Sequence, residues 1–321
     1  MAYGGVGTGM GPLDPSRYVD ITDVLYEIVP LKKPLFHLTM DGPKPKDRFH
    51  QWMTRTYSVR APTARAVGET FGFTNENKLP SLDQFNYVEI LAKFIRVSDL
   101  EAATMHYAIP DKVDDQVKTE LGILGTDIEH TLWRESLDSI ALGNMTTPRM
   151  QGIMMAIFCA GTTWTNLNGA LSEANLNGWL VRMFDIGSEP QDCWVSARLQ
   201  NFISTYNGQS TNTRFIEADR TTAIFSVLDY QSALQPLHFH ITRDVYSGNV
   251  SPSATLPQDA TRSGCSAVFL DHSMIRKCWL EPVLVERATR TALSTDLVAH
   301  TMLTLEWGHP HAHAWIANIS T

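Results

Sequence analysis

Two clusters of histidines are the residues whose types and spacing could support catalysis. His309, His311 and His313 alternate along the chain, and His238 and His240 form a second His-x-His pair. Alternate side chains of a β-strand point to the same face, so each cluster would present neighbouring imidazoles. Three histidines with an open fourth position are one form of a catalytic zinc site. The sequence therefore leaves open a metal-dependent hydrolase, and the competing interpretation is a polar, partly buried strand face.

The surroundings of the histidines favour the structural interpretation. No carboxylate stands at ligand spacing beside residues 309–313, and no glutamate is placed as a general base. The carboxylate pairs Asp114/Asp115 and Asp127/Glu129 are expected on a solvated or subunit-facing helix surface. We therefore predict no catalytic, cofactor-binding or metal-binding residues, and no cofactor.

Other signatures of enzymes are missing from the sequence. It contains no GxSxG or SxxK nucleophile motif, and no GxxxxGK[ST] phosphate-binding loop. The four cysteines form no CxxC pair, so we expect reduced and mostly buried thiols. They are Cys159, Cys193, Cys265 and Cys278. The sequence thus predicts a protein that is not an enzyme.

Composition narrows the remaining functions. The chain is 43% hydrophobic and 19% charged, which is typical of a globular protein. A net charge of −8 argues against a protein that coats DNA or anionic lipid. We find neither a signal peptide nor a run of about 20 apolar residues that would span a membrane. The 8 tryptophans and 12 methionines suggest extensive contact surfaces.

The elements that would position these residues begin with a glycine-rich arm. A short helix is expected over 21–28, and two strands, 48–60 and 85–97, flank a long loop at 61–82. A loop of this length is usually functional or reaches a partner. Residues 110–142 follow as one long amphipathic helix.

The long helix is the clearest element because its apolar residues recur at helical spacing. They are Val113, Val117, Leu121, Leu124, Ile128 and Leu132. Pro110 and the aspartates after it suit the first turn. Gly122 and Gly125 lower helix propensity, and we interpret them as marks of a close approach by another backbone.

The rest of the chain mixes helices and strands. Ser172 and Gly187 cap a helix at 172–187. The remaining predicted segments are a strand and helix at 191–207, strands within 225–232 and 234–246, a polar loop at 249–264, two strands within 266–288, and a strand pair at 297–317 with a turn at 308–310.

Several phrases in this order resemble the major capsid proteins of tailed phages with the Hong Kong 97-like fold, and in particular the podophage major head protein family. They are ITDVLYEIVPLKKPLF, RAVGETFGFTN, NYVEILAKFIRVSD, LGILGTDIEHTLW, MQGIMMAI, LSEANLNGWLVRMFD and AHAWIANIST. The resemblance covers about residues 21–321 and is weakest over 205–265.

The resemblance implies an α+β fold with four regions. Residues 1–47 would form the N-terminal arm and short helix, and 48–98 the extended E-loop. Residues 99–147 and 266–321 would form the P-domain, with its spine helix at 110–142, and 148–265 the A-domain. Lys78 lies near the expected loop tip, but the lysine–asparagine cross-link of the prototype is not carried over.

The same resemblance implies a function in the virion. The chain would self-assemble as pentamers and hexamers into an icosahedral or prolate head shell that encloses double-stranded DNA. Expected partners are other copies of the chain, with scaffold, portal and decoration proteins as further candidates, and no membrane. Besides the hydrolase, the alternative is another virion structural protein of the tail or decoration class.

Overall fold

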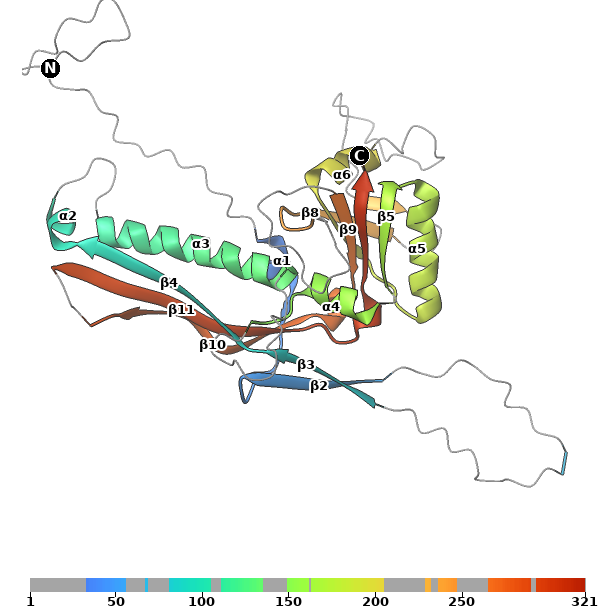
Figure 1. The fold of residues 1–321 in the computed structure, drawn as a ribbon, viewed down its shortest axis with the longest axis horizontal. Helices are drawn as coiled ribbons and strands as arrows, with labels where there is room; N and C mark the ends of the chain where they lie inside the picture. The colour runs from blue at the N-terminus through green and yellow to red at the C-terminus, as the bar shows by residue number, and fades with distance from the viewer. Residues whose placement is uncertain are drawn as a thin grey trace, which may run out of the picture.

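The computed structural model describes residues 33–55, 67–68, 81–104, 111–134, 149–161, 163–204, 229–231, 236–246, 265–289 and 293–320. The predicted helix at 21–28, Lys78 and the polar loop at 249–264 lie outside these residues. Figure 1 shows a long helix over an elongated sheet, a block of strands and helices at one end, and a hairpin that leaves their junction. The predicted α+β class is confirmed.

The elongated sheet has four strands in the order β1-β10-β11-β4. Its strands are β1 (Met40–Asp41), β4 (Glu89–Ser98), β10 (Arg276–Arg287) and β11 (Ser294–Glu306). The pairs β10–β11 and β11–β4 are antiparallel, and β1 runs parallel to β10. Two short helices lie at its ends, α1 (Pro34–Leu38) before β1 and α2 (Asp99–Ala103) after β4.

The predicted long helix is α3 (Lys112–Arg134), and it packs along β4 and β11. Its predicted apolar face is confirmed, because Leu124, Ile128 and Leu132 are buried and the earlier apolar residues are partly buried against the same core. The Asp111 carboxylate accepts hydrogen bonds from the first turn. Residues 135–142 of the prediction lie outside the described part. Among the described helices, none is both long and apolar enough to cross a membrane.

Gly125, one of the two glycines of α3, faces a side chain and not the backbone that we predicted. A Cβ at Gly125 would lie 2.0 Å from Lys33 Nζ, so a side chain and not another backbone occupies this space. A larger residue at position 125 would require the flexible Lys33 side chain to move.

The second sheet has six strands in the order β5-β12-β9-β6-β8-β7. Its strands are β5 (Trp164–Ala170), β6 (Asp192–Val195), β7 (Asp229–Gln231), β8 (Pro236–Ile241), β9 (Cys265–Leu270) and β12 (Ala314–Ser320). The β5–β12 and β6–β8 pairs are parallel, and the other pairs are antiparallel.

Three helices accompany this sheet. They are α4 (Ile153–Ala160), α5 (Glu173–Ile186) and α6 (Ala197–Ser204). The predicted caps of α5 are confirmed, because Ser172 Oγ accepts a hydrogen bond from Asn175 N and Gly187 adopts a φ of 94°. The two sheets share a core cluster, in which the rings of Trp133 on α3 and Trp194 on β6 lie 5.2 Å apart.

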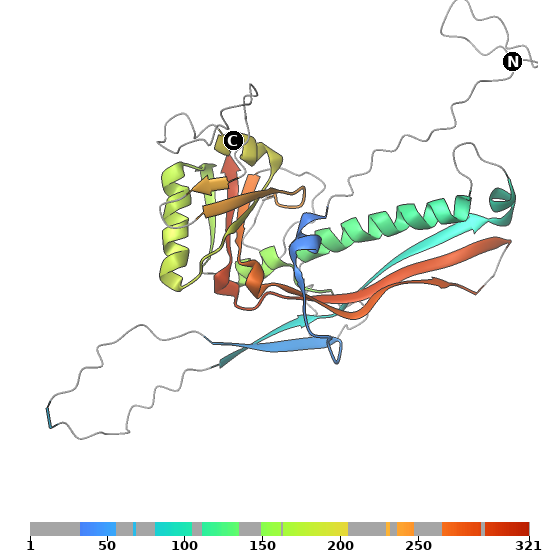
Figure 2. The same cartoon turned by 180° about the vertical axis from the view of Figure 1, so that it is seen from behind.

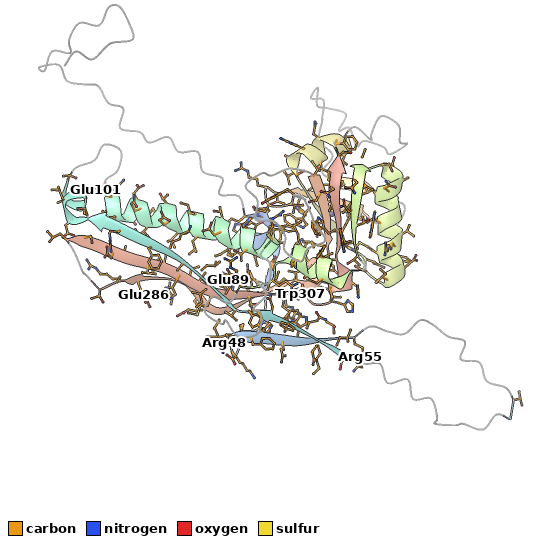
Figure 3. The ribbon with its side chains drawn as sticks, in the orientation of Figure 1. Arg48, Arg55, Glu89, Glu101, Glu286 and Trp307 are labelled. Carbon is orange, nitrogen blue, oxygen red and sulfur yellow. The ribbon has the colours of Figure 1, made fainter. Side chains whose placement is uncertain are left out.

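The hairpin consists of β2 (Phe49–Arg55) and β3 (Ser81–Tyr87), which within the described part of the chain pair only with each other. The single strand predicted over 85–97 is wrong, because the chain divides at buried Val88 into β3 and β4. Its two halves join different sheets (Figure 2). In Figure 3, Arg48 and Arg55 label the two ends of β2, and Trp307 labels the junction with the body.

The strand pair predicted for the C-terminal segment is also wrong as a pair. β11 and β12 form as strands, but they belong to different sheets. The turn between them contains the 3-10 helix η3 (Pro310–Ala312), and the earlier turn at Asp271 contains η2 (His272–Met274). The final segment therefore connects the two sheets.

Candidate functional sites

The predicted histidine strand at 309–313 does not form. These residues make the turn around η3, where the backbone N–H of His311 donates to His309 Nδ1 at 3.1 Å. The rings of His309 and His311 lie 5.0 Å apart and are partly buried. A tight turn breaks the alternation of a strand, so the three imidazoles do not share one face.

His313 is fully buried between two backbone groups. Its Nε2 donates to the carbonyl oxygen of Trp307 at 3.0 Å, and its Nδ1 accepts from Asp271 N at 3.3 Å. Burial lowers the pKa of His313 to about 4, against a smaller opposing effect of the Trp307 carbonyl. The neutral ring thus satisfies both nitrogens, and His313 has a structural role.

The second histidine pair does lie on a strand, as predicted. His240 Nε2 contacts Asp192 Oδ1 at 2.6 Å, and His272 Nε2 lies 3.7 Å from the same carboxylate. Burial alone would raise the pKa of Asp192, but the His240 hydrogen bond and the charges of the nearby histidines lower it overall. His238 lies on the same face of β8 and is exposed.

Neither histidine cluster builds a metal site within the part of the chain that the structure describes. None of the five predicted histidines belongs to a group of three ligand atoms within 4.8 Å of one another. The geometry therefore gives no support to the metal-dependent hydrolase.

The interpretation of Glu129 as a surface carboxylate is wrong. Its side chain accepts hydrogen bonds from the backbone N–H groups of Leu35 and Phe36 and from Trp133 Nε1. Burial raises the pKa of Glu129, although these three hydrogen bonds oppose the shift. The other pair members behave as expected, since Asp114 and Asp127 form partly exposed ion pairs with lysines.

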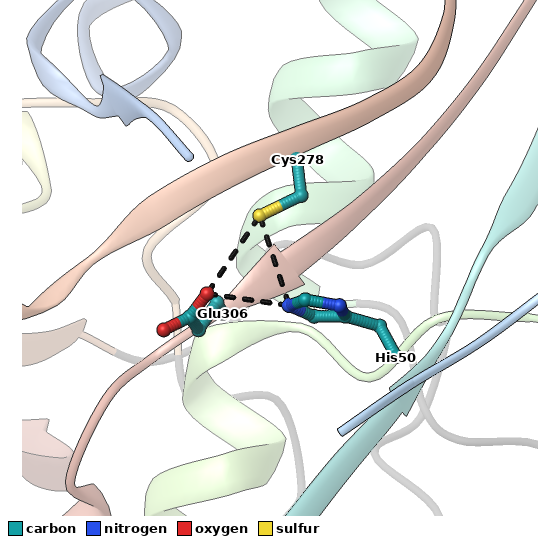
Figure 4. A group of neighbouring side chains, drawn as sticks. All are labelled: His50, Cys278 and Glu306. Atoms are coloured by element: carbon teal, nitrogen blue, oxygen red, sulfur yellow. Dashed lines mark hydrogen bonds and ion pairs between the residues drawn. The ribbon is translucent and has the colours of Figure 1, made fainter. Parts of the chain in front are cut away.

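Sequence reasoning missed a compact group formed by His50, Cys278 and Glu306. Glu306 Oε2 lies 3.2 Å from His50 Nε2 and 3.8 Å from Cys278 Sγ, and Sγ lies 3.9 Å from Nε2. Figure 4 shows the three side chains converging from β2, β10 and β11. Burial and the Glu306 carboxylate raise the pKa of Cys278 to about 12. No local motif signals this group, because His50 lies 228 residues from Cys278.

The hairpin presents an apolar outer face. The pairs Phe49–Tyr87, Gln51–Phe85 and Met53–Asp83 place these side chains on one side of the two-stranded ladder. Met53 is 76% exposed, and the Phe49 and Phe85 rings stack at 5.1 Å. The opposite side faces the body, where Trp52 Nε1 donates to the carbonyl oxygen of Gly308 at 2.8 Å.

The elongated sheet has a second exposed apolar surface, on the side away from α3. Lys93 pairs with Asp127 of α3, and Ile95 is buried, so these odd-numbered residues face the helix. The alternate residues Ile90 and Phe94 point away from it and are 54% and 80% exposed. Scattered exposed apolar residues need no explanation, but two on one strand face form a candidate contact surface.

A third apolar surface lies on the outer side of α5. It comprises Val181 and Phe184, which lie about one helical turn apart and are both exposed. Figure 1 places the hairpin, the elongated sheet and α5 on different sides of the molecule. A chain with three separated apolar surfaces can contact several neighbours at once.

The tryptophans contribute less to these surfaces than their number suggested. All eight lie in the described residues, and none of their side chains is exposed. Four of them, Trp133, Trp194, Trp307 and Trp315, are buried in the core. Burial thus removes these four as candidate subunit contacts, and the other four are partly buried. Met, Phe and aliphatic residues form the exposed surfaces.

Comparisons with known proteins agree over almost the whole chain. The family model described as SU10 major capsid protein matches residues 5–320. No curated protein sequence matches the chain significantly.

Solved structures share the fold at low sequence identity. The capsid asymmetric unit of cyanophage A-1(L) has a TM-score of 0.65 at 13% identity, covering 95% of this chain and 98% of that one. The capsid structure of cyanophage P-SCSP1u gives 0.61 at 13% identity, with 94% and 93% covered. The SrpI encapsulin of Synechococcus elongatus gives 0.60 at 10% identity, with 94% and 93% covered. The fold is thus Hong Kong 97-like.

Proposed function

The chain belongs to the SU10 major capsid protein family and forms the head shell of a tailed phage, and we propose that it does so as hexamers and pentamers joined through its three apolar surfaces. The observation that carries this proposal is the hairpin β2–β3, which pairs with no other strand among the described residues and exposes Met53 at 76%. Covering this face with a neighbouring subunit would remove apolar area from water.

The regions of the subunit have separate tasks in this proposal. The hairpin is the E-loop, which lies across a neighbour. The four-stranded sheet with α3 is the P-domain, and the six-stranded sheet with α5 and α6 is the A-domain. Sheet membership divides the closing segment 266–321 between them, since β10 and β11 lie in the first sheet and β9 and β12 in the second.

The shell encloses double-stranded DNA without binding its sequence. A net charge of −8 supports this proposal, because a protein that neutralised many phosphates would hinder DNA packaging and release. Scaffold, portal and decoration proteins are the further candidate partners of such a shell. The sequence phrases shared with podophage major head proteins support a podophage origin, which adjacent portal and scaffold genes would test.

Substitution at the hairpin tests the assembly proposal. Met53→Asp places a charge on a side chain that is exposed in the isolated subunit, so the subunit should still fold, with only local repulsion from Asp83 opposite it on β3. We expect wild-type protein to form closed shells in sedimentation and electron microscopy. Met53→Asp protein should remain as small species that are folded, with a melting temperature only slightly below that of the wild type. A buried charge without a partner at the interface is the physical reason.

The matched control is Met53→Leu, which keeps the apolar character and should retain assembly. Normal shell formation by the Met53→Asp protein would show that the outer face of the hairpin is not a contact between subunits.

A further inference from the structure

The group of His50, Cys278 and Glu306 lies where the hairpin meets the elongated sheet. Cys278 on β10 pairs with Thr304, and Arg276 pairs with Glu306, so Cys278 and Glu306 are diagonal neighbours on one face of the ladder. His50 approaches this face from β2. The three ligand atoms therefore come from three strands. Backbone pairing holds β10 beside β11, whereas β2 is paired with β3 of the hairpin.

The separations between these atoms are close to those of a tetrahedral zinc site. Zinc bonds of about 2.0 Å to oxygen, about 2.05 Å to nitrogen and about 2.3 Å to sulfur place ligand atoms about 3.3 Å (N–O) and about 3.5 Å (S–N and S–O) apart. The corresponding distances here are 3.2, 3.9 and 3.8 Å. Shifts of a few tenths of an ångström in the Cys278 side chain would complete the geometry.

We propose that His50, Cys278 and Glu306 bind one Zn²⁺ ion that fastens the hairpin to the sheet. The donor set is one that zinc accepts, with imidazole, thiolate and carboxylate ligands. On binding, the Cys278 thiol releases its proton to the solvent, and the thiolate and carboxylate charges balance the two charges of the ion. A water molecule would take the fourth position.

The surroundings suit a structural ion. Cys278 is fully buried, and the His50 and Glu306 side chains are only 12% and 14% exposed. A Cβ at position 42 would lie 2.5 Å from Cys278 Sγ, so Gly42 leaves the space that the thiol occupies. Outside the three ligands, the negative charge of Asp41 and the positive charge of Arg276 both act on Cys278, and their effects oppose each other.

Zinc binding would join two parts of the molecule that are distant along the chain, because His50 and Cys278 are separated by 228 residues. An ion held by both would connect the root of the hairpin to β10 and β11, in addition to the Trp52 hydrogen bond. The hairpin would keep a fixed direction relative to the sheet. Binding of the ion to the unassembled chain does not depend on the assembly proposal.

The test uses the full chain without an affinity tag, in unassembled form. After equilibration with Zn²⁺ and gel filtration, elemental analysis should give about one zinc per chain, and Zn²⁺ should raise the melting temperature. Co²⁺ as a probe should produce the charge-transfer absorption of a cobalt–thiolate bond. Cys278→Ser should abolish that absorption, and His50→Gln should weaken Zn²⁺ binding at least tenfold.

The control is Cys159→Ser, which removes the exposed thiol and should leave both signals unchanged. Circular dichroism shows whether each variant is folded. If the Cys278→Ser protein does not fold, Zn²⁺ binding by the His50→Gln protein provides the test. Wild-type chain with less than a tenth of an equivalent of zinc and no cobalt–thiolate band would overturn the proposal. Loss of the band in Cys159→Ser instead of Cys278→Ser would also overturn it.

Discussion

Two buried titratable side chains, His313 and Glu129, have hydrogen-bond partners that suit one protonation state. The neutral His313 ring donates from Nε2 and accepts at Nδ1, so protonation would place a hydrogen on Nδ1 against the N–H of Asp271. Glu129 shows the opposite arrangement, with three N–H donors around one carboxylate. Each side chain therefore contributes to stability in one charge state only.

The burial of His313 predicts that the unassembled subunit loses stability as the pH falls. Its pKa is about 4 when folded and about 6.5 when unfolded, so between these values the unfolded chain binds more protons and stability rises with pH. We expect a loss of about 2 kcal/mol from this group between pH 7 and pH 5. Urea unfolding at the two pH values measures the difference.

His313→Gln is the comparison for this measurement. This substitution should lower the free energy of unfolding at pH 7 and reduce the dependence of that free energy on pH. Burial also lowers the pKa values of the partly buried His309 and His311, so these two residues should account for a remaining pH dependence. Equal wild-type stability at both pH values would contradict the assignment of His313 as a neutral buried ring.

At the residue scale the sequence predicted least. Glu129 looked like a surface carboxylate because its three donors include two from α1, over ninety residues away in the chain. In the proposed zinc site, His50 lies 228 residues from Cys278 and 256 residues from Glu306. The 309–313 alternation suggested a strand, but Pro310 begins a 3-10 turn there. Contacts set by tertiary folding leave no local pattern.

Elements with strong local signals were predictable. The spacing of apolar residues in α3 and the capping residues of α5 arise within one helix, and both predictions are confirmed. The division of 85–97 into β3 and β4 could not be predicted, because it depends on the pairing of β4 with β11, which lies some two hundred residues later in the chain. Both halves have the composition of strands, so the sequence gives no sign of the change of partner.

The packing of α3 predicts a large effect of Leu124→Asp. Leu124 is 2% exposed in the core between the helix and the sheet, so the substitution loses apolar burial and buries an unpaired charge. We expect a loss of at least about 3 kcal/mol in the free energy of unfolding, or no soluble protein. Chemical denaturation or the soluble yield measures it.

Lys118→Gln is the control on the solvent side of the same helix. The Lys118–Asp114 pair is exposed, so its removal should change stability little. Soluble and assembly-competent Leu124→Asp protein would show that this face of α3 is not part of the core.

At the scale of the whole molecule, the shape explains how one chain can build a shell. A rigid body of two sheets with a shared core holds three apolar surfaces on different sides. The fold class and capsid function were predicted through the order of elements and the resemblance of phrases, not through any single site. The identity of the candidate contact residues required the structure, since burial in the isolated subunit removes half of the tryptophans from consideration.

A cryo-electron microscopy reconstruction of shells assembled from this chain tests the central claim most directly. The account predicts a closed particle of fivefold and sixfold capsomers, in which Met53 and Phe85 of the hairpin and Phe94 of β4 are buried against neighbouring subunits. A closed particle in which these side chains remain exposed to solvent, or the absence of closed particles under all assembly conditions, would contradict it.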